Sequence, residues 1–318
     1  MATTAQNLSK AIQGLWRDRS NDPNQLPQAL TFSPVNPMLG NGEYQILVDD
    51  LRLDERDDAA GSARGDNAQY APGEFGYGSV AVQTERHASL LYKLPQSVID
   101  AIEGQNGFVR VSEDAMKATS NQILDRYTGK WAAAAAAGLA APSAGGLDLS
   151  DVTTDILAYF DSVIDEIQKG SAKRPTHLIM GAEAFRAFRN MDQVQGSTAL
   201  GGAASGGSFR RTGYAPMSAV AEFFRAAFGI EILVEDRTKI NTSGAGAYTL
   251  STQAVLGYAG DPRSSCITTF AKSADLIEFD VRDLSMPDPV GIGCAANAWY
   301  KVEVTNPAAG RILTVTLP

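Results

Sequence analysis

The sequence contains few side chains that could carry out catalysis or bind a metal ion. Its 318 residues include two histidines, His87 and His177, and two cysteines, Cys266 and Cys294. A serine–histidine–aspartate triad would have to use one of these histidines. We interpret His87 as a surface residue among polar neighbours and His177 as a satisfied polar group where a strand begins. The cysteines lack metal-ligand spacing and are interpreted as buried small side chains rather than a redox pair.

No longer motif points to an enzyme. The chain has no G-x-x-x-x-G-K-[ST] phosphate loop, no G-x-S-x-G nucleophile elbow and no H-E-x-x-H zinc motif. The triplet Thr128-Gly129-Lys130 lacks the earlier glycine of a phosphate loop and falls inside an expected helix. We therefore expect a protein that is not an enzyme, with no catalytic residue, no cofactor and no metal.

Charged side chains gather in one segment of the chain. Two arginines, Arg52 and Arg56, interrupt a run of six acidic residues there: Asp49, Asp50, Asp54, Glu55, Asp57 and Asp58. The D-x-[DN]-x-[DN]-G pattern of a calcium loop is absent. Three readings stay open, namely a metal site, a solvated strand of mixed charge, and an edge that meets a basic partner surface.

Composition excludes two further classes of protein. The net charge of −9 argues against sequence-independent binding to nucleic acid, which needs clustered Lys and Arg. No apolar stretch approaches the roughly 20 residues that span a bilayer, so no membrane helix is expected.

The first third of the chain lacks a core of its own. Residues 1–43 are expected to form an extended arm, because four prolines between 23 and 37 disfavour helix in the residues before them. Residues 44–94 are predicted to form a long two-stranded hairpin with arms at 44–53 and 79–94, where apolar side chains alternate with polar ones. An isolated hairpin cannot bury enough surface, so a neighbour should stabilise it.

The rest of the chain mixes helices and strands. A short helix is predicted at 95–103, and a long one at 112–137, whose apolar stripe includes Tyr127 and Trp131 and which ends in six alanines. Next, a helix is predicted from Val152 to Ile167, capped after Lys169 by Gly170. Further elements are expected as a strand at 176–180, helices from 182 and at 217–228, and strands at 230–234, 248–256, 276–284, 299–305 and 311–317. This is an α+β pattern without regular βαβ repetition.

The order of these elements resembles the major capsid proteins of tailed bacteriophages, which have the Hong Kong 97 fold. Three segments are similar to family patterns: DVTTDILAYFDSVIDEIQKGSAKRPTHLIMGAEAFRAFRN (151–190), FFRAAFGIEILVED (223–236) and WYKVEVTNPAAGRILTVT (299–316). The resemblance covers nearly the whole chain, and its motifs are loose.

The resemblance implies a Hong Kong 97-like division of the chain. Its parts would be an N-terminal arm (1–43), an extended β-hairpin loop (44–94), a peripheral domain with a long spine helix (95–141 and 265–305), and an axial α/β domain (142–264 and 306–318). The glycine-rich loop at 196–213 would lie near the five-fold and six-fold centres of a shell.

The resemblance also implies a function. The chain would be a structural major capsid protein that assembles as pentamers and hexamers into an icosahedral shell around phage double-stranded DNA, without binding that DNA specifically. Its partners would be copies of itself, a separate scaffolding protein, a portal and, where one is present, a decoration protein. It would be synthesised in the bacterial host cytoplasm and reside in the virion capsid. The alternatives are an encapsulin-like nanocompartment shell and, more remotely, a soluble hydrolase with a long flap.

Inter-subunit contacts are expected from the hairpin loop and the glycine-rich loop. The candidate residues are Arg52, Asp54, Glu55, Arg56, Glu74, Phe75, Tyr77, Arg210 and Arg211. Some family members join subunits covalently through a lysine on the extended loop, but here no lysine lies between Lys10 and Lys93. We therefore predict non-covalent assembly. The acidic charge further suggests an inner surface that does not trap DNA.

Overall fold

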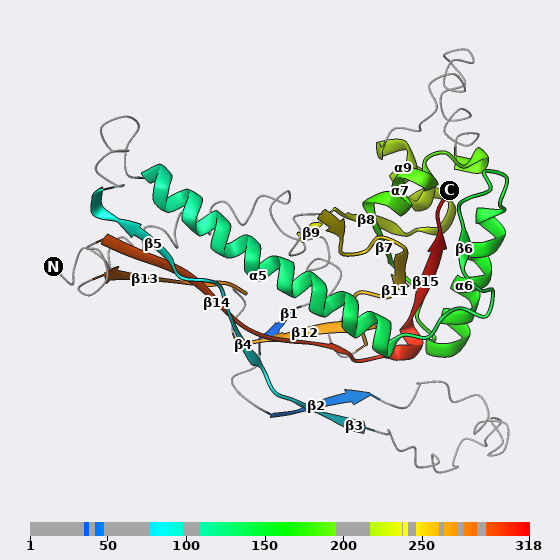
Figure 1. Cartoon of the computed structure of the whole chain (residues 1–318). Coiled ribbons are helices and arrows are strands. Elements are labelled where there is room, and N and C mark those ends of the chain that lie inside the picture. The colour runs from blue at the N-terminus through cyan, green and yellow to red at the C-terminus, as the bar shows by residue number, and fades with distance from the viewer. Residues whose placement is uncertain are drawn as a thin grey trace, which may run out of the picture.

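The structure, a computed structural model, describes residues 35–37, 42–47, 77–97, 109–194, 217–236, 238–240, 246–260, 264–272, 276–284 and 291–318. Helices and strands are interleaved in these ranges, which confirms the predicted α+β class. Two larger sheets and one long helix dominate the fold (Figure 1). Two short pairs of strands complete it: β2 (Gly42–Leu47) with β3 (Tyr77–Val82), and β9 (Thr238–Ile240) with β10 (Gly246–Tyr248).

The six-stranded sheet is built around one long strand, β14 (Gly291–Val304). Its other members are β1 (Val35–Pro37), β4 (Glu85–Ala88), β5 (Tyr92–Pro95), β12 (Ile267–Ala271) and β13 (Glu278–Leu284). Strands β12 and β13 pair antiparallel with one side of β14, while β4 and β5 pair antiparallel with the other side. Strand β1 lies parallel to β12 at the outside.

The long helix α5 (Val109–Gly138) covers one face of this sheet (Figure 1). Its 30 residues span about 45 Å at 1.5 Å per residue. The predicted helix at 112–137 is confirmed, and the predicted apolar stripe packs on the sheet, with Ile123, Tyr127 and Trp131 fully buried. The helix continues through Gly129. Among the described residues, no helix is both long and apolar enough to cross a membrane.

The five-stranded sheet has the strand order β6-β15-β11-β7-β8. Its strands are β6 (Leu147–Asp148), β7 (His177–Gly181), β8 (Glu231–Glu235), β11 (Gln253–Gly257) and β15 (Gly310–Thr316). The helices beside it are α6 (Ile156–Ser171), α7 (Ala182–Phe188) and α9 (Met217–Phe228), and a 3-10 turn η2 (Pro307–Ala309) precedes β15. The rings of Phe160, Phe188 and Phe224 meet at centroid distances of 5.0–6.4 Å and anchor these helices to one another.

The two larger sheets share buried side chains where they meet. Ile179, Leu233 and Val255 come from the five-stranded sheet, yet they belong to the same buried cluster as Trp131 and Tyr300. A shared apolar core resists relative movement, because separating the sheets would expose those side chains to water. The two sheets therefore form a continuous body.

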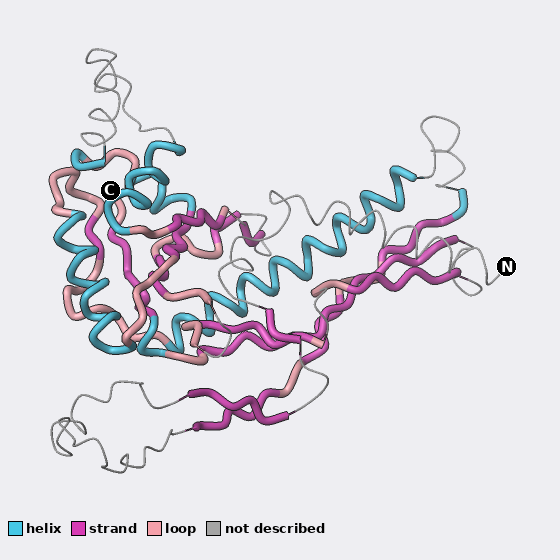
Figure 2. The backbone as a smooth tube through the Cα atoms, turned by 180° about the vertical axis from the view of Figure 1, so that it is seen from behind, coloured by secondary structure: helices cyan, strands magenta, loops and turns pink. Residues whose placement is uncertain are grey.

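The predicted hairpin is only partly correct. Residues 42–47 pair with 77–82, so a hairpin exists, but 85–88 and 92–95 pair with β14 instead of with the first arm. The predicted return arm 79–94 is therefore divided between two sheets: its first residues pair with β2, whereas β4 and β5 pair with β14. In both views the pair β2–β3 lies apart from the larger sheets (Figure 1, Figure 2).

Both predicted ends of helix α6 are wrong. The helix begins at Ile156 rather than at Val152, because Asp155 caps it: the Ala158 N–H donates to Asp155 Oδ1 at 3.1 Å. It runs through Gly170 to Ser171 and is capped by Ala172, whose φ of 52° is left-handed and whose N–H donates to the Gln168 carbonyl. Pro175 follows shortly, and proline disfavours helix in the residue before it.

Several other predicted strands and one predicted helix differ from the structure in their bounds. The strands at 276–284, 299–305 and 311–317 are confirmed with shifted starts, since β14 already begins at Gly291. Strand β12 was not predicted as a separate element. Of the short helix predicted at 95–103, only Gln96 and Ser97 are described as helical, and the remainder lies outside the described residues.

Candidate interaction surfaces

The predicted contact residues fall almost entirely outside the part of the chain that the structure describes. This holds for Arg52, Asp54, Glu55, Arg56, Glu74, Phe75, Arg210 and Arg211. The backbone of Tyr77 begins β3 and pairs with Leu47, but its side chain is not described. The acidic run 49–58 lies outside as well. All of these contacts stay predictions.

The sheet face opposite α5 carries a tryptophan with two cations near its ring. Arg86 of β4 pairs in register with Trp299 of β14, and its guanidinium carbon lies 5.7 Å from the ring centroid. The Lys272 ammonium lies 5.3 Å from the same ring. Arg86 also donates to Asn297 Oδ1 from Nε at 3.3 Å and from Nη2 at 3.0 Å. Each exposed cation–π contact is worth about 0.5–1 kcal/mol, so the cluster holds these long side chains in place.

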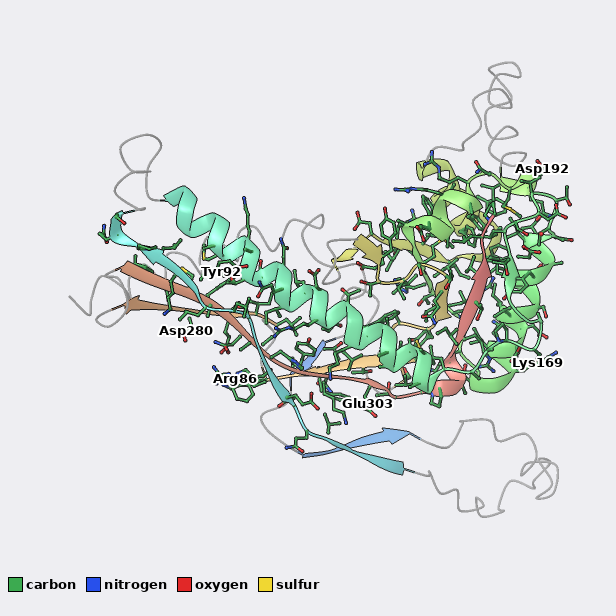
Figure 3. The ribbon with its side chains drawn as sticks, in the orientation of Figure 1. Arg86, Tyr92, Lys169, Asp192, Asp280 and Glu303 are labelled. Atoms are coloured by element: carbon green, nitrogen blue, oxygen red, sulfur yellow. The ribbon has the colours of Figure 1, made fainter. Side chains whose placement is uncertain are left out.

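Charges of both signs surround this cluster. Figure 3 shows Arg86, Asp280 and Glu303 pointing to the side of the sheet away from α5. Lys301 and Glu303, two positions apart on β14, form an ion pair of 3.1 Å. A face with interspersed signs suits contact with a protein surface better than contact with nucleic acid, which favours uniformly basic patches.

The prediction that His87 is a surface residue is wrong. Its side chain is only 13% exposed, and its ring stacks on Tyr300 at 4.3 Å between centroids. Strand pairing places His87 opposite Ala298, on the face that α5 covers. Burial lowers the pKa of His87 below its ordinary value, although the Glu85 carboxylate opposes that shift.

The aromatic cluster continues from His87 into α5. Tyr127 meets Tyr300 edge to face at 5.2 Å, and the Tyr127 hydroxyl hydrogen-bonds Thr269 Oγ1 at 2.6 Å. The Tyr300 hydroxyl is buried and makes no hydrogen bond with the described protein, and burial raises its pKa. The stacked and edge-to-face rings and the buried hydroxyls give this cluster the geometry of a packed core.

The remaining candidate residues behave as structural groups. His177 Nδ1 hydrogen-bonds Thr176 Oγ1 at 2.8 Å where β7 begins, which confirms its reading as a satisfied polar group. Cys266 and Cys294 are buried free thiols, as interpreted, and burial raises the pKa of Cys266 to about 12. Within the described ranges, no cluster of three His, Cys, Asp or Glu side chains could hold a metal ion.

Neither protein-family models nor curated protein sequences match this sequence. Solved structures, however, match nearly the whole chain. A phage-related protein of Bordetella bronchiseptica is 14% identical, with a TM-score of 0.61, and the match covers 90% of each chain. A chain of the mature capsid of bacteriophage PhiM1 is 9% identical, with a TM-score of 0.53, and the match covers 91% of this chain and 87% of that one.

This is a Hong Kong 97-like phage capsid fold. A capsid chain of the cyanophage P-SCSP1u agrees, at 10% identity and a TM-score of 0.52, over 90% of this chain and 87% of that one. Identities this low show the fold alone. The exposed features of the sheet in this fold are the Arg86–Trp299 cluster and the outer edge formed by β4 and β5.

Sequence reasoning missed the Arg86–Trp299 cluster, although a signal for it existed. In the strand predicted at 299–305, the apolar residues Tyr300 and Val302 lie two positions apart and therefore on one face. Strict alternation then places Trp299 on the opposite face, where an aromatic side chain is unusual enough to mark a contact surface.

Proposed function

We propose that this chain is the structural major capsid protein of a tailed bacteriophage. Copies would assemble as pentamers and hexamers into an icosahedral shell that encloses double-stranded DNA. The observation that carries the proposal is the capsid fold, which extends over about nine tenths of the chain and includes a PhiM1 mature capsid chain among its matches. In this function the chain acts mechanically and is not an enzyme.

The separation of the hairpin supports assembly with neighbours. In the described part of the chain, β2 and β3 pair with each other and with no other strand. Two-stranded hairpins are marginally stable alone, so a surface of another subunit would complete their burial. The predicted contact residues between 52 and 77 belong to the connection and start of this hairpin, and we retain them as proposed contacts.

The packing of α5 supports the proposed domain division. We assign α5 and the six-stranded sheet to a peripheral domain and the five-stranded sheet with its helices to an axial domain. Because β4 and β5 pair with β14, we place residues 85–95 with the peripheral domain and end the extended loop near Val82. The glycine-rich loop with Arg210 and Arg211 stays our candidate for the shell's symmetry centres.

The proposed partners follow from the same function. Besides its own copies, the chain would meet a separate scaffolding protein, a portal and, where present, a decoration protein, with synthesis in the host cytoplasm before incorporation into the virion. The basic surface needed for tight DNA binding is not expected on a chain of net charge −9, so the genome would be held by confinement.

The mass of the purified protein in solution tests this function. We expect species of five or six times 33.7 kDa, or closed particles, in analytical ultracentrifugation at micromolar concentration. A stable monomer or dimer at every concentration would contradict the proposal and favour the hydrolase alternative. Particles from the native source that contain cargo protein in place of DNA would favour the nanocompartment alternative.

A further inference from the structure

We propose that the segment Ser89–Leu91, on the outer edge of the six-stranded sheet, is a contact between copies of this chain. Leu90 and Leu91 would be buried against a neighbouring copy in the assembled particle. This inference rests on the proposed function, since it supposes that copies assemble, and it adds a contact at the sheet edge outside the hairpin and glycine-rich loops.

The first observation is exposed apolar surface. Leu90 is 65% exposed and Leu91 is 37% exposed. Among the described residues one other large apolar side chain is exposed, Val152, which lies before helix α6. Single exposed apolar residues are ordinary, but two adjacent leucines on the edge of a sheet form a local apolar patch.

The second observation is a bulge that places these leucines outside the sheet. Ala88 pairs with Asn297, and Tyr92 pairs with Cys294, so the three residues 89–91 lie opposite the two residues 295–296. The extra residue disrupts the ladder locally. Ser89 replaces part of the lost backbone pairing: its N–H donates to the Ala296 carbonyl and its Oγ accepts from the Ala296 N–H, both at 2.8 Å. Bulges at sheet edges typically redirect side chains, here those of the two leucines.

The third observation is that α5 holds the bulge in one conformation. The Leu90 N–H donates to Gln122 Oε1 at 3.0 Å, and Gln122 Nε2 donates to the Tyr92 hydroxyl at 2.8 Å. Arg126, one turn further along α5, donates to the Ala88 carbonyl. A segment fixed in this way loses little conformational entropy when a partner covers it. The bulge is therefore preorganised for contact, although its leucines are exposed in the single chain.

The position of the bulge indicates that the partner is another copy. Helix α5 covers one face of the sheet, and the Arg86–Trp299 cluster occupies the other, so the β4–β5 edge lies between the two faces (Figure 1). In a shell whose wall contains the plane of this sheet, an edge residue points along the wall, where the next subunit lies.

Charge supports the same occupant. Exposed basic side chains lie on the elements beside the bulge, Lys93 on β5 and Arg126 and Lys130 on α5, and Lys130 pairs with Glu85 at 3.7 Å. A second copy carries a net charge of −9 and therefore offers an excess of acidic surface to this basic rim. An apolar centre within a polar rim is the usual composition of a protein–protein contact, whereas phosphates would leave the leucines without apolar partners.

Cysteine labelling tests whether the bulge is covered in assembled particles. Both native cysteines are buried, so the variants Leu90→Cys and Val152→Cys each present one accessible thiol. We expect maleimide to label Cys at position 90 at least about tenfold more slowly in particles than in free subunits, since the reaction needs an accessible thiolate. The thiol at position 152 controls for slowing by enclosure. Equal rates in particles and free subunits, or equal slowing at both positions, would overturn the contact.

A photo-crosslinking residue at position 90 identifies the occupant. With p-benzoylphenylalanine in place of Leu90, irradiated particles should yield a product of two copies of the chain. A crosslink to another protein or to DNA, or no crosslink at all, would overturn the assignment to a second copy. Leu90→Cys particles in which position 90 labels as fast as in free subunits would refute the inference and leave the proposed function standing, whereas a wild-type chain that forms no particles would refute both.

Discussion

Replacing both exposed leucines by serine should weaken assembly while the subunit stays folded. Leu90 and Leu91 are 65% and 37% exposed, so together they offer about the surface of one whole leucine side chain. Burying such a side chain contributes about 1.5–3 kcal/mol. Because 1.4 kcal/mol is a factor of ten in an equilibrium constant, the double variant should raise the critical concentration for particle formation about 10- to 100-fold.

The assay is sedimentation of particles over a series of protein concentrations. The control is Val152→Ser, which removes exposed apolar surface elsewhere and should change the critical concentration less than about threefold, because surface substitutions usually stay within 0.5 kcal/mol. Circular dichroism of the unassembled double variant should show a folded subunit, while its unfolding temperature should fall somewhat, because part of Leu91 is buried within the subunit. A wild-type critical concentration in the double variant, or an equal effect in Val152→Ser, would refute the reasoning.

Three further predictions concern the fold and the chemistry of assembly. Gly181→Ala should destabilise the subunit by more than about 3 kcal/mol in denaturant unfolding, because an added Cβ would overlap the Leu250 carbonyl. Gly170→Ala, where a Cβ would make only ordinary contacts inside α6, should instead stabilise the subunit by about 0.5–1 kcal/mol. Equal effects of the two substitutions would contradict the close contact between Gly181 and Leu250. Burial lowers the pKa values of His87 and His177, so the folded state favours their neutral forms. The contribution of these neutral histidines to the free energy of unfolding is fully present above pH 6.5 and should be lost as the pH falls through the lowered pKa values. The variant His87→Phe with His177→Gln should therefore lose stability less steeply between pH 7 and 5.5, and an unchanged slope would count against this assignment. Boiled particles should migrate as a single band near 33.7 kDa on a denaturing gel, since no lysine lies between Lys10 and Lys93, and a ladder of covalent oligomers would disprove non-covalent assembly.

Local patterns predicted the elements whose apolar spacing is strong. The stripe around Tyr127 and Trp131 predicted α5 correctly, and the apolar run after His177 predicted β7. In such segments the local preference and the tertiary packing agree, so periodicity alone is sufficient. Helix ends were less predictable: Asp155 and Ala172 determine the ends of α6 through single hydrogen bonds, which apolar spacing does not reveal.

Features that depend on distant partners could not be read from the sequence. The alternation of apolar and polar residues in 79–94 fits the second arm of a hairpin and equally an edge strand of a larger sheet. Only the pairing of β4 and β5 with the distant strand β14 shows that residues 85–95 belong to the larger sheet. The burial of His87 follows from that same pairing, because it decides which face of β4 meets α5. The bulge at Ser89–Leu91 likewise arises from a register between segments about 200 residues apart. Two adjacent leucines that break the period of two were its only local sign.

Electron microscopy of the purified particles tests the central claim most directly. The account predicts closed icosahedral shells in which pentamers and hexamers of this chain form a continuous wall. Discrete small oligomers without shells, under conditions in which the chain is folded, would contradict the proposed function.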